Sequence, residues 1–291
     1  MRFPFTGVIP VDKPKGVTSR RVVDAIAKAL RTKAVGHAGT LDPLAEGVVV
    51  VLVGHATRLM EFVQELPKRY VGGFLLGRSS PSDDLETPAK IEADPVVPDA
   101  HDLERALEAF TGDLLQRPCD YSAVHVDGKR AYDLARKGRA VEIPAKPIRI
   151  DRLAVVEYVW PRLVLDVTCS SGTFIRALGR DLAIHLGTRG LMESLSRESV
   201  GPFTRHSSLP LERSFEAEGA MLPAAAAVPH LPQVDLDDDR LRRLTRGIIV
   251  DVAEARGHAA AAAIAPDGSL VGILRPHESG GQRLRPNFLG Q

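Results

Sequence analysis

The sequence predicts an α+β protein that ends in a small β-rich region. Short apolar runs typical of strands are mixed with amphipathic segments typical of helices, without the regular alternation of a βαβ fold. No internal repeat is present. A proline- and alanine-rich stretch at 222–232 sets apart a last segment, 233–291, that is too small for a large core of its own.

The N-terminal elements surround a glycine-rich loop. A strand is predicted at 8–11, and Ser19 is predicted to cap a helix whose apolar stripe runs from Val22 to Leu30. The loop 36–47 follows, and it leads directly into a strand of the buried type at 48–53. A reactive side chain in this loop would therefore be held in place by the core strand that follows it.

The middle of the chain continues the irregular mixture. Residues 68–76 alternate loosely and predict a strand, whereas the acidic, proline-rich stretch 78–98 predicts a loop. The remaining predicted elements are a helix at 101–110, strands at 141–143, 148–158 and 163–168, and a helix from 172 to about 185.

The C-terminal segment carries two conflicting local signals. The turn Pro266-Asp267-Gly268 predicts a β-hairpin, but the alanine run 259–263 favours helix by intrinsic propensity. We divide the chain into a domain at 1–230 and a second, β-rich domain at 231–291.

Composition excludes several classes of protein. The 291 residues are 44% hydrophobic and 26% charged, as in ordinary globular proteins. The longest apolar run, 48–53, is too short to span a bilayer, and no signal-peptide core opens the chain. Cys119 and Cys169 imply neither a disulfide framework nor a zinc cage, and the histidines lack metal-ligand spacing. We therefore expect a cytoplasmic protein without a metal.

Charge is unevenly distributed although the net charge is only +1. The segments 12–35 and 125–152 are rich in lysine and arginine, whereas 83–108 is acidic. Such a chain can offer a basic face to a polyanion while remaining nearly neutral overall. Solvated helix faces would explain the same pattern, so charge alone does not decide between the two.

The loop sequence "GHAGTLDPLAEG" at 36–47 contains an aspartate that stands before a proline. Pro43 keeps Asp42 out of helical geometry, so Asp42 is expected in an extended or turn conformation. Glycines allow a sharp turn or the close approach of another molecule. A solvated Asp-Pro turn is the plain alternative to a catalytic carboxylate.

Four separated segments decide between these alternatives: 7–19, 35–51, 68–77 and 169–183. Together they resemble the TruB family of tRNA pseudouridine synthases, and the stretches at 110–118, 122–138 and 195–203 extend the similarity over most of 7–205. The resemblance implies the pseudouridine synthase catalytic fold, a mixed and mainly antiparallel sheet flanked by helices. It also implies a small PUA-like C-terminal domain that grips the acceptor stem of tRNA.

The resemblance implies conversion of uridine to pseudouridine at position 55 in the T loop of tRNA, after the nucleotide is flipped out. The reaction needs no cofactor and no metal, but it needs a carboxylate nucleophile that attacks uracil C6 or ribose C1′. Asp42 matches this nucleophile, and Arg176 matches the arginine that pairs with it. A neighbouring cation favours the ionised carboxylate. Taken alone, Arg176 could equally be a surface helix residue.

Further residues match positions that hold the substrate. Tyr70 matches a tyrosine that packs on the target base, although tyrosines in strands are more often simple packing residues. Leu195 and Phe174 match the pocket lining, where the family usually has tyrosine in place of Phe174. By the same resemblance His37 inserts into the T loop, and the pair Lys13–Pro14 forms the site wall, with Lys13 also available to neutralise phosphate.

Two departures from the family pattern stand in one segment: Cys119 replaces a usual proline and His125 a usual lysine. We expect them to tune an RNA contact without loss of activity. The expected partner is tRNA alone, bound by a monomer without an obligatory protein partner.

Three alternatives remain at this stage. A guide-RNA-dependent synthase would need a fuller C-terminal domain and partner-binding extensions. An RNA-binding chaperone that folds tRNA would not need Asp42, Tyr70 and Arg176 together. A carboxylate-nucleophile hydrolase would need a general acid or metal ligands that the sequence does not offer.

Overall fold

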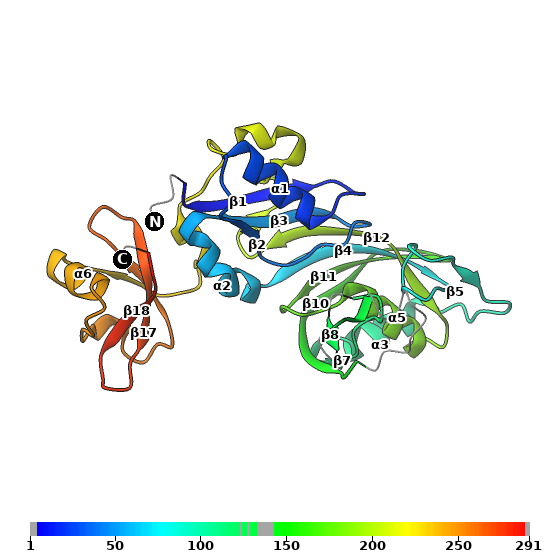
Figure 1. The fold of residues 1–291 in the computed structure, drawn as a ribbon. Coiled ribbons are helices and arrows are strands. Elements are labelled where there is room, and N and C mark those ends of the chain that lie inside the picture. Colours follow the sequence, from blue (N-terminus) through cyan, green and yellow to red (C-terminus); the bar gives the residue numbers. More distant parts are fainter. Residues whose placement is uncertain (1–4, 123, 127–128, 133–142, 289–291) are drawn as a thin grey trace. The chain divides into compact units, whose positions relative to one another are not determined.

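The computed structural model describes residues 5–122, 124–126, 129–132 and 143–288, and the ribbon in Figure 1 follows the chain through them. The chain divides into two compact units. The first unit comprises Met1–Leu41, Val48–Gln64 and Pro202–Gln291, and the second comprises Asp42–Gly47 and Glu65–Gly201. Within the described residues, no helix combines the length and apolarity needed to cross a membrane.

Among the described helices, three begin at a residue whose side chain accepts a backbone hydrogen bond: Thr18, Asp99 and Asp237. The α-helices are α1 (Ser19–Ala29), α2 (Met60–Glu65), α3 (Ala100–Ala109), α5 (Ile175–His185) and α6 (Asp238–Thr245). The 3₁₀ turns are η1 (Gly54–Leu59), η2 (Leu211–Glu216), η3 (Ala224–Ala227) and η4 (Ala253–Ala255). The predicted cap of α1 is wrong by one residue: Thr18 accepts a hydrogen bond from the Arg21 amide, and Ser19 is the first helical residue.

In the first unit, strands line up in the order β14-β1-β3. Their bounds are β1 (Gly7–Lys13), β2 (Val35–His37), β3 (Glu46–Val53), β13 (Phe203–Thr204) and β14 (Leu209–Pro210). β2 runs antiparallel to β3, and α1 lies against β1 with its apolar stripe buried (Figure 1). The strand predicted at 48–53 is confirmed, and every one of its residues is buried.

In the second unit the main sheet has the order β12-β4-β11-β10-β7, and each neighbouring pair is antiparallel. Its strands are β4 (Lys68–Leu76), β7 (Gly112–Gln116), β10 (Lys146–Val159), β11 (Arg162–Cys169) and β12 (Gly190–Val200). Two-residue ladders join β5 (Arg78–Ser79) to β6 (Lys90–Ile91) and β8 (His125–Val126) to β9 (Lys129–Arg130). The predicted mixed, mainly antiparallel sheet is confirmed.

Helix α5 packs closely on this sheet because of one glycine. A Cβ atom at Gly179 would collide with the ring of Phe74 on β4, so only glycine allows the helix to approach this far. Ile175, Leu178 and Leu182 are buried on the same helix. The helix was predicted from about residue 172 and begins at Ile175. The strand predicted at 141–143 lies largely outside the described residues.

The C-terminal segment forms a separate four-stranded sheet. Its strands, in spatial order, are β15 (Gln233–Asp235), β16 (Ala261–Ile264), β17 (Leu270–Pro276) and β18 (Gln282–Asn287). The predicted hairpin is confirmed between β16 and β17, and Gly268 has the positive φ of +80° that its turn requires.

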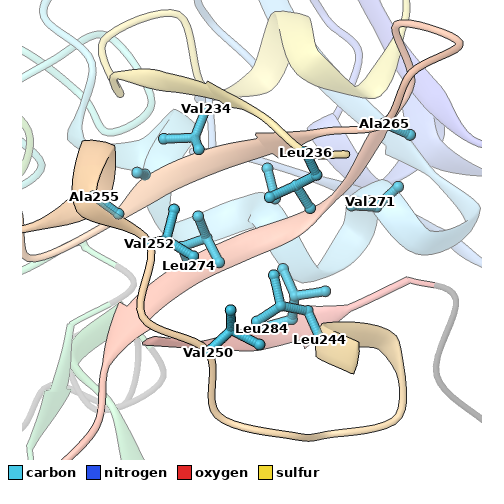
Figure 2. Packing of buried hydrophobic residues seen from close by; sticks show 12 residues of the cluster. Val234, Leu236, Leu244, Val250, Val252, Ala255, Ala265, Val271, Leu274 and Leu284 are labelled. Carbon is cyan, nitrogen blue, oxygen red and sulfur yellow. The ribbon is translucent and has the colours of Figure 1, made fainter. Parts of the chain in front are cut away.

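An apolar cluster fills this small sheet. In Figure 2, Leu244 of α6 lies beside Leu284 and Val250 in the cluster. Ala261, Ala262 and Ala263 are almost inaccessible, so burial in the sheet outweighs their helix propensity. The sheet and its core begin close to the proposed boundary at 230/231, which stays a prediction.

Candidate active site

Asp42 begins a tight turn. The amide of Ala45 donates to the Asp42 carbonyl over 3.1 Å, with Pro43 second in the turn, which is the geometry its sequence predicts. The residue before it is fixed as well, because the Ser19 hydroxyl accepts from the Leu41 amide at 2.8 Å and donates to the Leu41 carbonyl at 3.0 Å. The Asp42 side chain is 38% exposed, so it remains accessible to a substrate.

The end of this loop is anchored to β12. Glu46 and Gly47 pair in parallel with Ser196 and Arg197. Gly47 has a φ of +104°, and a Cβ there would collide with the backbone of Arg197. This glycine therefore serves the close packing of two protein segments, and the sequence alone did not reveal that purpose.

Arg176 is the centre of a buried polar network. Its Nη2 lies 2.9 Å from Asp42 Oδ2, and its Nη1 lies 3.2 Å from Asp84 Oδ2. The guanidinium also donates to the carbonyls of Ser82 at 3.0 Å and Tyr121 at 2.9 Å. Its side chain is only 7% exposed. The structure therefore places Arg176 opposite Asp42 and holds it there from three further directions.

Electrostatics keep this arginine charged. Burial opposes the charge of Arg176, but the carboxylates of Asp42, Asp84 and Asp83 and the nearby Cys119 outweigh burial and raise its pKa. A permanently charged, immobile guanidinium orients the carboxylate of Asp42 in a fixed direction.

The sequence analysis missed Asp84, which lies in the predicted loop 78–98. Its side chain is 3% exposed, and its Oδ1 accepts from the Ser82 hydroxyl at 2.5 Å and from the Glu86 amide at 2.9 Å. The adjacent Asp83 pairs instead with Arg180, at 2.9 Å. Two consecutive aspartates look alike in the sequence, so only the fold distinguishes them.

Tyr70 and Leu195 lie on the sheet face that α5 covers. Tyr70 pairs with Arg197 across β4 and β12, and Leu195 pairs with Gly72 two residues further along β4. A Cβ at Gly72 would lie 3.5 Å from Ile175 Cγ2 of the helix, which places this face under α5. Tyr70 is 8% exposed, and both it and Leu195 are buried.

Arg197 is a second residue that sequence analysis missed. It is 2% exposed and hydrogen bonds to the Tyr70 hydroxyl. Burial raises the pKa of Tyr70, while Arg197 acts in the opposite direction. Phe174 is half-buried and is the N-cap residue of α5, two positions before Arg176.

Three predicted site residues belong to the first unit. Lys13 is fully buried, and its ammonium donates to the carbonyls of Pro14 at 3.1 Å and Val17 at 2.7 Å. This environment argues against a phosphate contact by Lys13. His37 is half-buried on β2, where its backbone pairs with Val51.

The departure at Cys119 does not reach the surface. Cys119 is completely buried, and burial raises the pKa of its thiol, which hydrogen bonds to the Asp83 carboxylate. The expected RNA contact is therefore wrong for Cys119. The side chain of His125 lies outside the described part. Among the described residues, no group of three or more His, Cys, Asp or Glu is arranged to hold a metal ion.

Comparisons with known proteins agree with this geometry. Residues 27–175 match the family described as TruB family pseudouridylate synthase (N terminal domain). A protein of Streptomyces griseus named tRNA pseudouridine synthase B is 38% identical over 283 residues, which is 94% of each chain. A protein of the same name from Rhodopirellula baltica is 38% identical over 259 residues, covering 83% of this chain and 74% of its own.

A solved structure also shares the fold. The chain superposes on one titled "Crystal Structure of a Cbf5-Nop10-Gar1 Complex" with a TM-score of 0.71 and 25% identity, over 98% of this chain and 81% of that one. The fold, the sequence match and the full-length relatives agree. The chain belongs to the TruB family of pseudouridylate synthases.

Proposed function

We propose that this protein isomerises uridine to pseudouridine at position 55 in the T loop of tRNA. The observation that carries the proposal is the accessible Asp42 carboxylate held 2.9 Å from a buried, fully partnered Arg176. Family membership supports the reaction class. Relatives at 34–38% identity over most of the chain carry the name tRNA pseudouridine synthase B, which favours tRNA over a guide-RNA-directed substrate.

Asp42 supplies the nucleophile in this proposal. Its carboxylate oxygen forms a bond to uracil C6 or to ribose C1′, and the N1–C1′ bond breaks. The detached base turns, C5 bonds to C1′, C5 loses its proton, N1 gains one, and the bond to Asp42 breaks. The product is an isomer of the substrate, so no oxidant, reductant or group donor is consumed.

The other residues hold the flipped base. Tyr70 packs on the uracil and moves a proton during the rearrangement, and Leu195 lies on the same sheet face. Phe174 offers a stacking surface without the hydroxyl that tyrosine would provide. His37 enters the T loop where the flipped base has left a gap, and Pro14 belongs to the site wall.

The two predicted domains have different tasks in this proposal. We assign 1–230 to catalysis and 231–291 to a PUA-like domain that contacts the acceptor stem. The enzyme acts in the cytoplasm as a monomer, without a protein partner. A tRNA-folding chaperone is the alternative function, but it would not require the Asp42–Arg176 pair.

The direct test is incubation of unmodified tRNA with purified protein, followed by mapping of pseudouridine at each uridine. We expect modification at position 55 of the T loop alone. A second arm in EDTA should give the same yield on folded tRNA. Absence of pseudouridine, or its formation only at other uridines, would overturn the proposal.

A further inference from the structure

A buried glutamine next to the site makes an unusual pair of hydrogen bonds. Gln116, the last residue of β7, is 4% exposed. Its Oε1 accepts from the Phe174 amide at 2.8 Å, and its Nε2 donates to the Phe174 carbonyl at 3.1 Å. Both ends of one side-chain amide are thus used on the backbone of a single residue, as a neighbouring strand would do.

The residue held in this way is the entrance to α5. Phe174 is the N-cap, with extended backbone angles of φ −97° and ψ 107°, and no side chain caps the helix. Its carbonyl also accepts the first helical bond, from the Leu178 amide at 3.0 Å. Gln116 therefore fixes the position at which the chain enters the helix.

The contact continues along the segment 116–121. The carbonyl of Arg117 accepts from Arg180 Nη2 at 2.8 Å, and the carbonyl of Tyr121 accepts from Arg176 Nη2 at 2.9 Å. This segment holds the first turns of α5 at three places. Gln116 supplies the first of these contacts along the chain of α5, at the N-cap residue Phe174.

We propose that Gln116 is a positioning residue for the uridine pocket. Its amide sets the orientation of Phe174 and the depth of Arg176 opposite Asp42. The inference rests on the proposed function. A residue needed only to fill space would not need a donor and an acceptor aimed at one backbone, and loss of either leaves a buried group without its partner.

The test compares Gln116→Met, which keeps the volume but makes neither bond, with the control Ile150→Val. Ile150 is fully buried on β10 and pairs with Gly112 of β7, so its truncation perturbs the same sheet without removing either hydrogen bond between Gln116 and Phe174. We expect Gln116→Met to lower the single-turnover rate at saturating enzyme by about 10-fold to 100-fold. The Kd for unmodified tRNA should change by less than about threefold, because the phosphate contacts remain.

Ile150→Val should keep the wild-type rate within about twofold, even if its melting temperature falls by as much as that of Gln116→Met. Equal rate losses in the two variants would reduce Gln116 to a structural role and overturn the inference. So would an unchanged rate in Gln116→Met. If the wild type itself forms no pseudouridine, the proposed function fails, and the positioning role is then decided by hydrogen exchange.

Hydrogen exchange needs no RNA. In Gln116→Met the Phe174 amide should exchange faster than in wild type, and in Ile150→Val it should not. Gln116→Glu provides the conservative variant, because a protonated carboxyl can make both bonds. Burial should raise the pKa of a glutamate at this position above its ordinary value of about 4.3, so the Gln116→Glu rate should exceed that of Gln116→Met toward the acidic end of a series from about pH 8 to about pH 6. The inference would be contradicted if the Gln116→Glu rate never exceeds the Gln116→Met rate, or if Gln116→Met leaves hydrogen exchange at the Phe174 amide unchanged.

Discussion

The catalytic region and the C-terminal sheet use charge in opposite ways. In the second unit, Arg176, Asp84, Arg197 and Lys68 are all buried. In the described part of 233–288, Gln282 is the only buried polar or charged residue, and its Oε1 accepts from the Val252 amide at 2.7 Å. The C-terminal arginines lie outside an entirely apolar cluster.

This difference indicates a division of labour. Burial of charge is costly, so a fold retains it where the charge performs a task that solvent would weaken. Exposed arginines cost little and suit contact with a polyanion. The comparison predicts that substitutions in the catalytic region affect the chemical step, whereas substitutions in the C-terminal sheet affect the affinity for tRNA.

The largest effect is expected at Asp42. Asp42→Asn should abolish turnover, because the amide has nearly the same shape but is a poor nucleophile. Binding of tRNA should stay within a few-fold, since phosphate contacts dominate affinity. Single-turnover assays and filter binding measure the two quantities, with Asp113→Asn as an exposed control at 81% side-chain exposure. Substantial turnover by Asp42→Asn would disprove the assignment of Asp42 as the nucleophile.

A smaller loss is expected at Asp84. Asp84→Asn leaves Arg176 its carbonyl partners but removes the charge behind it, so the single-turnover rate should fall by about 10-fold to 100-fold. Asp83→Asn is the matched control, because Asp83 pairs with Arg180. Its rate should fall less. If the two neighbouring variants lose rate equally, the network around Arg176 has no special part in the reaction.

Deletion of the chain from Gln233 onward tests the other half of the comparison. Binding of full tRNA should weaken by about 10-fold, while the rate on bound substrate changes little. An isolated T stem-loop lacks the acceptor stem and should not respond to the deletion. The measurement is the single-turnover rate at saturating enzyme for both substrates. A truncated protein that is folded but inactive on saturating stem-loop would contradict the division.

The smallest effect concerns stability. Burial, aided by Arg197, lowers the pKa of Lys68 to about 8 in the folded protein. Above that pH the folded state has released a proton that the unfolded state still holds, up to the ordinary lysine value of 10.5. The free energy of unfolding of the wild type, relative to Lys68→Met, should therefore rise with pH through this window. Urea titrations that give a constant difference would disprove it.

Local patterns predicted much of the fold. β4 was predicted with its observed bounds, and β3, α3 and α5 were predicted to within a few residues, because their apolar periodicity is strong. β12 was not predicted, although it is a central strand. Its segment mixes Glu193, Arg197 and Glu198 with serines, and only tertiary contacts explain how the sheet accommodates them.

Residues of the site were predicted only where they lie in the motifs that resemble the family. Asp42 and Arg176 could be named from the resemblance, and they form an ion pair in the structure. Asp84, Gln116 and Arg197 could not be found, because each acts on a partner far away in the sequence. No periodicity or turn signal in one chain identifies such a partner.

The position of Arg176 between two carboxylates has a consequence for the course of the reaction. In the proposed reaction, the negative charge of Asp42 passes to the uracil when its carboxylate forms the covalent bond. Asp84, 3.2 Å from the other side of the guanidinium, still neutralises the cation. Arg176 therefore keeps a carboxylate partner at the covalent stage, which avoids an isolated buried cation that would cost on the order of several kcal/mol.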